Sequence, residues 1–348
     1  MTDPWPPGQA RDWYERQPWL LGCNYIPGTA INQLEMWQPG TFDLATIGRE
    51  LAWARGLGFN ALRVFLHDLL WPQDAPGFVQ RIDAFLAAAA AHGMRAMLVL
   101  FEGVWDPRPA LGKQREPRSR VHNSGWVQSP GAAALAGAGQ RDRLRAYVTG
   151  VIDRFRDDPR VLAWDLFNEP DNPNTIAHGK HELPDKAGRA LDLLTAAHAW
   201  AREARPSQPI TMGVWRGRWP DIDRVSEIDR FMLTHSDVIS FHCYGGADDL
   251  RARLDELEQL ERPILLTEYL ARGAGSTFEA VLPVAKERRV GAFNWGLVSG
   301  KTQTVYPWDS WRRAYTAEPS PWFHDIFRPD GTPYSNEEVD FIRSLTGS

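Results

Sequence analysis

Eight short, β-prone apolar segments alternate along this chain with stretches that have the periodicity of amphipathic helices. This alternation constrains the fold more than any other feature, because strands that alternate with helices form parallel sheets. When each of eight strands is followed by a helix, the sheet closes into a (β/α)8 barrel. The predicted strands are residues 20–25, 59–66, 95–101, 161–167, 209–214, 237–242, 263–268 and 290–295.

The helical stretches between these strands have apolar residues at helical spacing, most clearly between residues 144 and 155. An open, doubly wound sheet is the rival architecture. It would need a glycine-rich phosphate-binding turn after the first strand, and residues 24–28 (Asn-Tyr-Ile-Pro-Gly) do not form one. With no internal repeat and no linker, we predict one domain over residues 1–348. Residues 1–19 are an N-terminal extension and the barrel begins at about residue 20. The predicted helices are residues 44–54, 78–86, 144–155, 185–204, 221–232, 250–257, 278–286 and 337–345.

Two loops are unusually long, those after the third predicted strand (103–131) and the eighth (296–324). Both are rich in Trp and Pro, and in a barrel they lie on the C-terminal face, where active sites are built. The chain has 16 Trp, and many lie in such irregular segments. Flat, partly exposed rings suit sugars, but ordinary loop packing explains them equally well. These loop tryptophans are Trp37, Trp71, Trp105, Trp126, Trp215, Trp219, Trp308, Trp311 and Trp322.

Composition argues against several other classes of protein. The net charge is −5 and no stretch forms a basic stripe, so a nucleic-acid partner is not expected. No run of about 18 apolar residues exists to span a membrane, and residues 1–21 lack the apolar core of a secretion signal. Cys23 and Cys243 are too few for a disulfide framework and are expected to be reduced core thiols. We therefore expect a cytoplasmic protein; its oligomeric state is not indicated.

Two glutamates stand at the ends of predicted strands, Glu169 after the fourth and Glu268 at the end of the seventh. Simple alternation along the fourth strand places Asp165, Phe167 and Glu169 on one side. A pair of carboxyl groups is the minimum equipment for glycoside hydrolysis, in which one is protonated and the other ionised. Their mutual repulsion raises one pKa and so separates the two roles. Taken alone, a glutamate at a strand end is more often a salt-bridge partner.

The residues around these glutamates favour the catalytic interpretation. His242 and Tyr244 share one face at the end of the sixth strand, and Trp295 ends the eighth. Arg63 points inward from the second strand, and a buried cation needs an anionic partner. Asp165 is expected to face inward as the partner of Arg63 or of another cation in the barrel. Tyr244 is placed to orient a nucleophile, and Trp295 to form the floor of a sugar subsite.

The order of these elements resembles the clan A (β/α)8 glycosidases, and in particular the cellulase-like glycoside hydrolase family 5 or a divergent relative. The resemblance extends from about residue 20 to 295. It implies an O-glycosyl hydrolase that cleaves β-linked glycosides or oligosaccharides with retention of configuration and without a cofactor or metal. The motifs that carry it are Asn168-Glu169-Pro170, His242-x-Tyr244, Glu268 and Trp295.

The resemblance also implies roles for individual residues. Glu169 corresponds to the acid/base, Glu268 to the nucleophile, and Asn168 to the partner of the hydroxyl group beside the reacting carbon. Long loops that close one end of a cleft would favour exo-action. The resemblance also implies that four further residues support the two catalytic glutamates: Arg63, His242, Tyr244 and Trp295.

One departure from the family pattern concerns substrate binding. Many family 5 enzymes have a His at the end of the third strand, where this chain reads Leu-Phe-Glu-Gly-Val-Trp over residues 100–105. Glu102 is either an additional acidic group that binds substrate or a salt-bridge partner at the rim, and Trp105 is a further candidate for substrate binding. His67 lies four positions after Arg63, so strand alternation places both on the same side. His67 is therefore either a substrate contact or a structural residue.

Two other functions would leave different residues in the chain. A metal-dependent barrel hydrolase would normally carry His-x-His on the first strand, which has no His, and the 9 His of the chain are scattered. A non-catalytic carbohydrate-binding barrel could retain Trp295 but would lose one of the two carboxylates, and both are present. The sequence does not distinguish hydrolysis from transglycosylation, nor does it identify the sugar.

Overall fold

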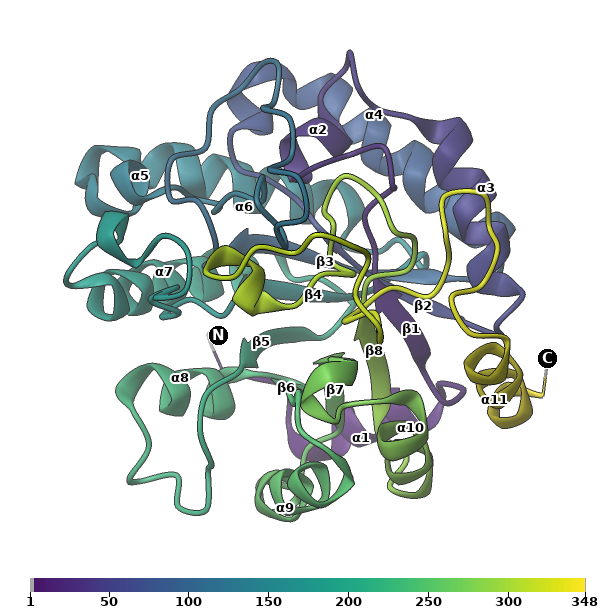
Figure 1. Ribbon diagram of the computed structural model, residues 1–348. Coiled ribbons are helices and arrows are strands. Elements are labelled where there is room, and N and C mark those ends of the chain that lie inside the picture. Colours follow the sequence, from purple (N-terminus) through teal and green to yellow (C-terminus); the bar gives the residue numbers. More distant parts are fainter. Residues whose placement is uncertain (1–2, 348) are drawn as a thin grey trace.

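Eight parallel strands form a closed barrel in which each strand pairs with the next in sequence and β8 pairs with β1. The computed structural model describes residues 3–347. Figure 1 shows the strands inside a ring of helices. The predicted (β/α)8 barrel is therefore confirmed. The strands are β1 (Leu21–Asn24), β2 (Ala61–Phe65), β3 (Arg95–Glu102), β4 (Val161–Asn168), β5 (Ile210–Val214), β6 (Ile239–His242), β7 (Ile264–Tyr269) and β8 (Gly291–Trp295).

A helix follows each strand and packs on the outside of the barrel (Figure 1). Three further helices lie in the N-terminal extension and in the loops after β1 and β3, where no helix was predicted: α1 (Pro7–Glu15), α2 (Gln33–Trp37) and α5 (Ala132–Ala136). The helices of the repeating units are α3 (Leu44–Arg55), α4 (Leu70–Ala91), α6 (Arg141–Phe155), α7 (Lys186–Ala204), α8 (Glu227–His235), α9 (Ala247–Leu257), α10 (Phe278–Glu287) and α11 (Asn336–Thr346).

The helix between β5 and β6 was predicted at residues 221–232, and its start is wrong. The helix α8 begins at Glu227 because Ser226 caps it: the Ser226 hydroxyl accepts a hydrogen bond from the backbone N–H of Asp229. Such a cap satisfies one of the N–H groups that have no partner within the helix. Residues 221–225 precede this cap and form a turn.

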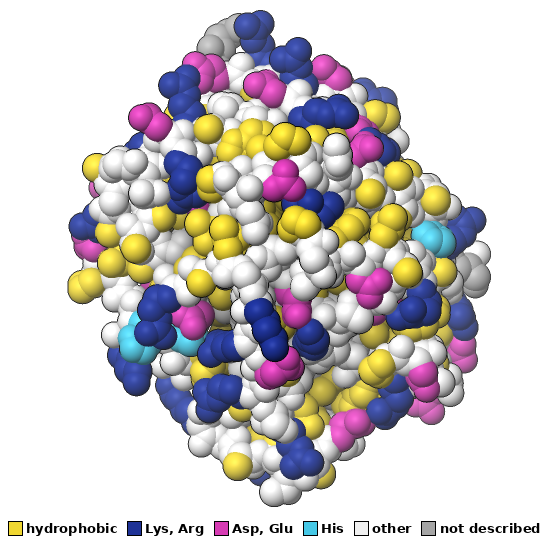
Figure 2. Space-filling model, turned by 90° about the horizontal axis from the view of Figure 1, so that it is seen from above, with side chains coloured by type: hydrophobic (Ala, Val, Ile, Leu, Met, Phe, Trp, Pro, Cys, Tyr) yellow, Lys and Arg dark blue, Asp and Glu magenta, His cyan; other side chains and the backbone are white. Residues whose placement is uncertain are grey.

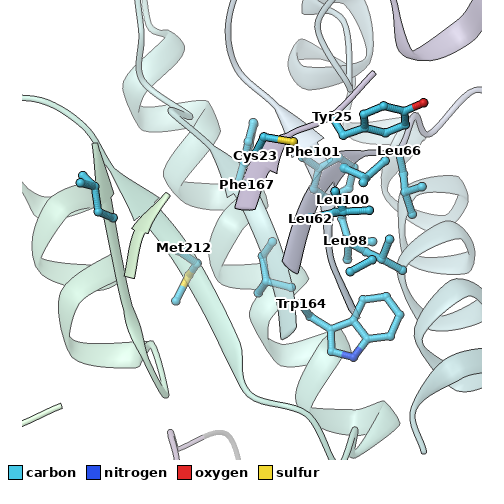
Figure 3. Close-up of a cluster of buried hydrophobic side chains, with 14 of the residues drawn as sticks. Cys23, Tyr25, Leu62, Leu66, Leu98, Leu100, Phe101, Trp164, Phe167 and Met212 are labelled. Atoms are coloured by element: carbon cyan, nitrogen blue, oxygen red, sulfur yellow. The ribbon is translucent and has the colours of Figure 1, made fainter. Parts of the chain in front are cut away.

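The main core fills the space between strands and helices. Alternate side chains of β2 and β3 point outward into it and meet the aromatic residues Phe78 and Phe85 of α4. Figure 3 shows part of this cluster. Because every second strand residue faces this layer, the remaining ones face the barrel interior. Members of the cluster labelled in Figure 3 include Leu62, Leu66, Leu98, Leu100 and Trp164.

The inside of the barrel is apolar at its N-terminal end and polar above it. Trp13 of α1 packs against the apolar floor, and the backbone N–H of Trp5 donates to Asp237 at 2.6 Å. The N-terminal extension thus covers this end of the barrel. Higher in the interior, the Thr211 hydroxyl donates to Ser240 at 2.7 Å. The floor residues are Leu20, Ala61, Met97, Leu162, Ala163, Val238, Leu265 and Phe293.

At the other end, three loops contact one another over the barrel mouth: the β3 loop (residues 103–131), the β4 loop (169–185) and the β8 loop (296–335). The Trp311 indole N–H donates to the carbonyl of His122 at 2.8 Å and joins the β8 and β3 loops. An Arg312 guanidinium N–H donates to the carbonyl of Thr175 at 3.0 Å and joins the β8 and β4 loops. The β8 loop therefore crosses the mouth of the barrel.

The molecular surface carries charges of both signs. In Figure 2, which views the molecule from above, Lys and Arg side chains are interspersed with Asp and Glu. Within residues 3–347, no helix has the length and apolar character needed to cross a bilayer. Cys23 and Cys243 are both buried and free.

Candidate active site

The end of β4 brings two consecutive polar residues to the barrel mouth. The register between β4 and β5 shifts between Asp165 and Asn168. Phe167 consequently packs in the outer core, with its ring 5.5 Å from that of Phe101 (both labelled in Figure 3), and Asn168 faces inward. Glu169 then adopts a positive φ of 41°, which turns its side chain toward the pocket. The prediction that Phe167 shares a face with Asp165 and Glu169 is wrong because of this irregularity.

Glu169 and Glu268 lie close together at the mouth of the barrel. One oxygen from each carboxyl group and one nitrogen of His242 lie within 4.8 Å of one another. Glu169 Oε1 is 2.6 Å from His242 Nδ1, and the Asn172 amide donates to its Oε2 at 2.6 Å. Burial raises the pKa of Glu169 to about 7. Burial also lowers the pKa of His242 to about 4, and a neutral imidazole can either donate to a carboxylate or accept from a carboxylic acid.

Glu268 has different neighbours. Arg63 Nη1 donates to its Oε1 at 2.9 Å, and the Tyr244 hydroxyl donates to its Oε2 at 2.7 Å. Burial raises the pKa of Glu268, whereas His242, Arg63 and Tyr244 act to lower it. An adjacent guanidinium stabilises the ionised form of Glu268, while Glu169 has no direct cationic partner among its hydrogen bonds. The two carboxyl groups therefore differ in their contacts: a guanidinium and a phenol donate to Glu268, whereas an imidazole and an amide contact Glu169.

Arg63 is completely buried and connects most of the site. Its Nε and Nη2 donate to Asp165 at 3.0 and 2.8 Å, which is the ion pair expected from the sequence. Nη1 also donates to Asn24 at 2.8 Å, and Nη2 donates to the side-chain oxygen of Asn168 at 2.6 Å. Because arginine can only donate, these contacts fix the orientation of each acceptor.

Removing this cation should destabilise the fold. We expect Arg63→Met to lower the free energy of unfolding by about 3–5 kcal/mol, because Asp165 and Glu268 are left as buried charges without compensation. Chemical denaturation measures the change. The exposed pair between Arg251 and Asp248 provides the control, since Arg251→Met should cost less than about 1 kcal/mol. If Arg63→Met lowered the free energy of unfolding as little as the control does, Arg63 would not be the cation that compensates the buried charges of Asp165 and Glu268.

The carboxyl groups open into a pocket of about 280 Å³. Among the described residues that line it there is no Lys or Arg, but there are three glutamates and five indole or phenol rings. Its lining residues are Glu102, Val104, Trp105, His122, Asn123, Asn168, Glu169, Asn172, Pro173, Asn174, Thr175, Ile176, Trp215, Tyr244, Glu268, Trp295, Trp308 and His324.

The structure separates the predicted site residues into groups. Arg63 and His242 do not line the pocket but contact the two carboxylates directly. His67 does neither: it is buried, and its Nδ1 accepts from the backbone N–H of Leu69 at 3.2 Å. β2 ends at Phe65, two residues before His67, so the strand alternation does not extend to this side chain. Predicted residues that line the pocket are Glu102, Trp105, Asn168, Glu169, Tyr244, Glu268 and Trp295.

Several pocket residues were not predicted to bind substrate. Asn172, which contacts Glu169, follows it by three positions but lies in an irregular loop without a recognisable pattern. The sequence identifies Trp215 and Trp308 only as tryptophans in loops. Their position in the wall depends on how the loops fold; the Trp215 indole, for example, donates to Asp171 at 2.7 Å.

This fold and site define a class of protein, a (β/α)8 barrel with a carboxylate pair at the C-terminal ends of β4 and β7. The model of one family, described as cellulase (glycosyl hydrolase family 5), matches residues 38–300. The chain belongs to glycosyl hydrolase family 5.

Curated relatives match at low identity. A probable mannan endo-1,4-beta-mannosidase A-1 from Aspergillus terreus is 25% identical over 120 residues, which cover 34% of this chain and 29% of the relative. A mannan endo-1,4-beta-mannosidase 2 from Oryza sativa subsp. japonica is 24% identical over 294 residues, or 72% of this chain and 61% of the relative. The chain thus spans less than two thirds of the length of either relative.

Solved structures share the fold. The exo-beta-1,4-mannosidase Op5Man5 from Opitutaceae bacterium strain TAV5 superimposes with a TM-score of 0.61 at 18% identity, over 94% of this chain and 59% of that one. An endo-1,4-beta-D-mannanase from Thermotoga petrophila gives a TM-score of 0.58 at 15% identity, over 94% of this chain and 99% of that one.

Proposed function

We propose that this protein is a retaining β-glycosidase in which Glu169 is the acid/base and Glu268 the nucleophile. The observation that carries the proposal is the pair of buried carboxyl groups with oxygens within 4.8 Å and different hydrogen-bond partners. Retaining enzymes hold their two carboxyl groups about 5–5.5 Å apart, whereas inverting enzymes leave about 6.5–9.5 Å for a water molecule. The close spacing favours direct attack by a carboxylate.

In the first step, a Glu268 oxygen forms a bond to the anomeric carbon while the bond to the leaving oxygen breaks. The proton of Glu169 passes to that oxygen. Tyr244 and Arg63 each donate to Glu268, which holds the nucleophile in place and keeps it ionised.

In the second step, a water molecule attacks the anomeric carbon and the bond to Glu268 breaks. Glu169, now ionised, accepts the proton of that water, which restores both carboxyl groups to their starting states. Two inversions give net retention. The neutral His242 can contact Glu169 in both of its protonation states and therefore supports the change of role.

We propose β-linked mannosides as the substrates. The names of the curated relatives support this choice, since mannan endo-1,4-beta-mannosidase recurs among them. The residues that line the pocket suit an uncharged sugar. Trp105, Trp295 and Trp308 offer flat apolar surfaces to the sugar ring. The side-chain amides of Asn168 and Asn172 can form hydrogen bonds with its hydroxyl groups. With three glutamates and no Lys or Arg in the described wall, the pocket disfavours anionic sugars.

We further propose exo-action. Leaving groups lie on the side of Glu169, near the β4 loop and Trp215. The β8 loop crosses the barrel mouth and is joined to both the β3 and β4 loops, through Trp311 and Arg312. A loop that crosses the barrel mouth would obstruct a long polymer that extends in both directions, which supports exo-action.

A panel of aryl β-glycosides and short β-linked oligosaccharides, including mannosides, tests the function. Hydrolysis of β-mannosides with release of single residues from one end is the expected result. Selective cleavage of another β-glycoside would overturn the mannoside assignment alone. Sugar binding without cleavage would support a carbohydrate-binding barrel instead, and activity abolished by a chelator and restored by zinc would support a metal-dependent hydrolase.

The pH dependence follows from Glu169. Because burial raises its pKa to about 7, the carboxyl group keeps its proton below that pH and loses it above. We expect kcat/KM to fall tenfold per pH unit on the basic side, starting near pH 7. A 2,4-dinitrophenyl glycoside, whose leaving group needs no proton, is the control and should show a weaker basic limb. A fall that begins near the ordinary glutamate value of 4.5 would contradict the assignment.

A further inference from the structure

The pocket contains a third carboxyl group that the proposed mechanism does not use. Glu102, the last residue of β3, lines the pocket and is 1% exposed. A salt bridge at the rim was one of the two interpretations of this residue from the sequence. The structure favours the other, since no Lys or Arg hydrogen-bonds to Glu102 within residues 3–347.

Within residues 3–347, all the hydrogen-bond partners of the Glu102 carboxyl group are N–H donors. The backbone N–H of Val104 donates to Oε1 at 2.6 Å, and the Trp126 indole N–H donates to Oε2 at 3.4 Å. The Asn168 side-chain amide reaches both oxygens at 3.2 Å. The backbone and indole contacts hold the carboxyl group in place, and the amide contact connects it to the residue next to the acid/base.

The Asn168 amide is held from two sides. Its oxygen accepts from Arg63 Nη2 at 2.6 Å, so its nitrogen must point the other way, toward Glu102. The amide nitrogen has two N–H groups, and Glu102 engages one side of it. The other N–H is available to the pocket that Asn168 lines. Arg63 also donates to Glu268, so it fixes the Asn168 amide relative to the proposed nucleophile.

We propose that Glu102 is a positioning residue that determines how strongly the enzyme recognises the sugar hydroxyl beside the reacting carbon. It acts through Asn168, by holding the amide so that its free N–H donates to that hydroxyl. The inference rests on the proposed glycosidase function. Hydrogen bonds to this hydroxyl strengthen in the transition state, so correct orientation of Asn168 increases kcat.

The surroundings of the Glu102 carboxyl group determine which side chains can replace it. Burial raises its pKa well above the usual value, and the nearby Glu268 and Glu169 raise it further. The N–H groups of Val104 and Asn168 act in the opposite direction, because they favour an acceptor oxygen at each carboxyl position. Glutamine keeps one acceptor oxygen for the Asn168 amide but turns an NH2 group toward the remaining N–H donors. It should therefore lose less activity than methionine, which has a similar shape and no comparable acceptor.

The test combines these two variants with a pair of substrates, an aryl β-glycoside and its 2-deoxy counterpart, which lacks the hydroxyl in question. For Glu102→Met we expect kcat/KM to fall about 30-fold on the parent substrate, mostly in kcat, and less than about 3-fold on the 2-deoxy substrate. For Glu102→Gln we expect a smaller loss of kcat/KM on the parent substrate, about 3- to 10-fold, and less than about a 3-fold change on the 2-deoxy substrate. If Glu102→Met does not fold, Glu102→Ala serves in its place.

The control is Glu50, another buried carboxyl group with a raised pKa, which accepts from the Tyr25 hydroxyl at 2.9 Å and lies outside the pocket. Glu50→Met should affect stability but leave the ratio of the two substrates unchanged. Equal losses on both substrates for Glu102→Met, or a loss for Glu102→Gln as large as for Glu102→Met, would overturn the positioning role. A wild-type protein that cleaves no glycoside would instead reject the proposed function, so the two failures are distinguishable.

Discussion

Glu268→Ala is expected to lower kcat/KM for an aryl β-mannoside by at least about 10⁴-fold, the scale of loss seen when a catalytic nucleophile is removed. No other carboxylate occupies its position between Arg63 and Tyr244. The alanine leaves a space beside the anomeric carbon that a small anion can fill. Added azide should restore turnover, and because it attacks from the side of the missing carboxylate, the product should be the α-glycosyl azide.

The matched control for this variant is Glu50→Ala, which removes a buried carboxyl group outside the pocket. It should retain most of the activity and should not respond to azide. Activity of Glu268→Ala within tenfold of the wild type would contradict the assignment of the nucleophile. A β-glycosyl azide from this variant would show that Glu268 is the acid/base instead.

The second large effect concerns Glu169→Ala, and it should depend on the leaving group. For a poor leaving group such as a sugar or an alkoxide, the loss should be about 10²–10⁴-fold, the usual contribution of general acid catalysis. For a 2,4-dinitrophenyl glycoside, the first step needs no proton, so the glycosyl-enzyme accumulates and its breakdown limits the rate. Azide should accelerate that breakdown and give the β-glycosyl azide.

This variant also tests the pH argument. The basic limb near pH 7 should disappear in Glu169→Ala, because the group with the raised pKa has been removed. Asn172→Ala, which removes one hydrogen bond to Glu169, provides a milder comparison and should reduce activity without abolishing it. The same loss for good and poor leaving groups in Glu169→Ala would contradict the acid/base role.

The barrel and its carboxylate pair could be predicted from the sequence because both depend on local, periodic signals. Strand residues alternate and helix residues recur every three to four positions, so eight units are visible without a structure. Arg63 was placed inward by the same alternation, and its partner Asp165 followed from the cost of burying an unpaired cation.

Predictions failed where the backbone departs from regular geometry. Alternation placed Phe167 inside the barrel, but the register shift in β4 turns Asn168 inward instead. His67 was assigned the parity of a strand that had already ended. Such shifts depend on hydrogen bonding to neighbouring strands, which the sequence of one segment does not specify.

The residues that line the pocket could not be predicted from the sequence either. Asn172 and Trp215 lie in loops, and loops lack a period that would indicate which side chains face inward. Contacts between the β3, β4 and β8 loops, such as that of Trp311 with His122, join residues nearly two hundred positions apart. The long, Trp-rich loops did indicate where the substrate pocket is, although not its shape.

The most direct test of the central claim is to trap the glycosyl-enzyme intermediate. A 2-deoxy-2-fluoro-β-mannosyl fluoride should react with loss of fluoride from the anomeric carbon and formation of a bond to the nucleophile, and the fluorine at carbon 2 should slow hydrolysis of that bond. Mass spectrometry of the digested protein then locates the sugar. The proposed mechanism predicts one sugar on the peptide that contains Glu268. A label on Glu169 or Glu102, or turnover to the α-anomer without any covalent adduct, would contradict it.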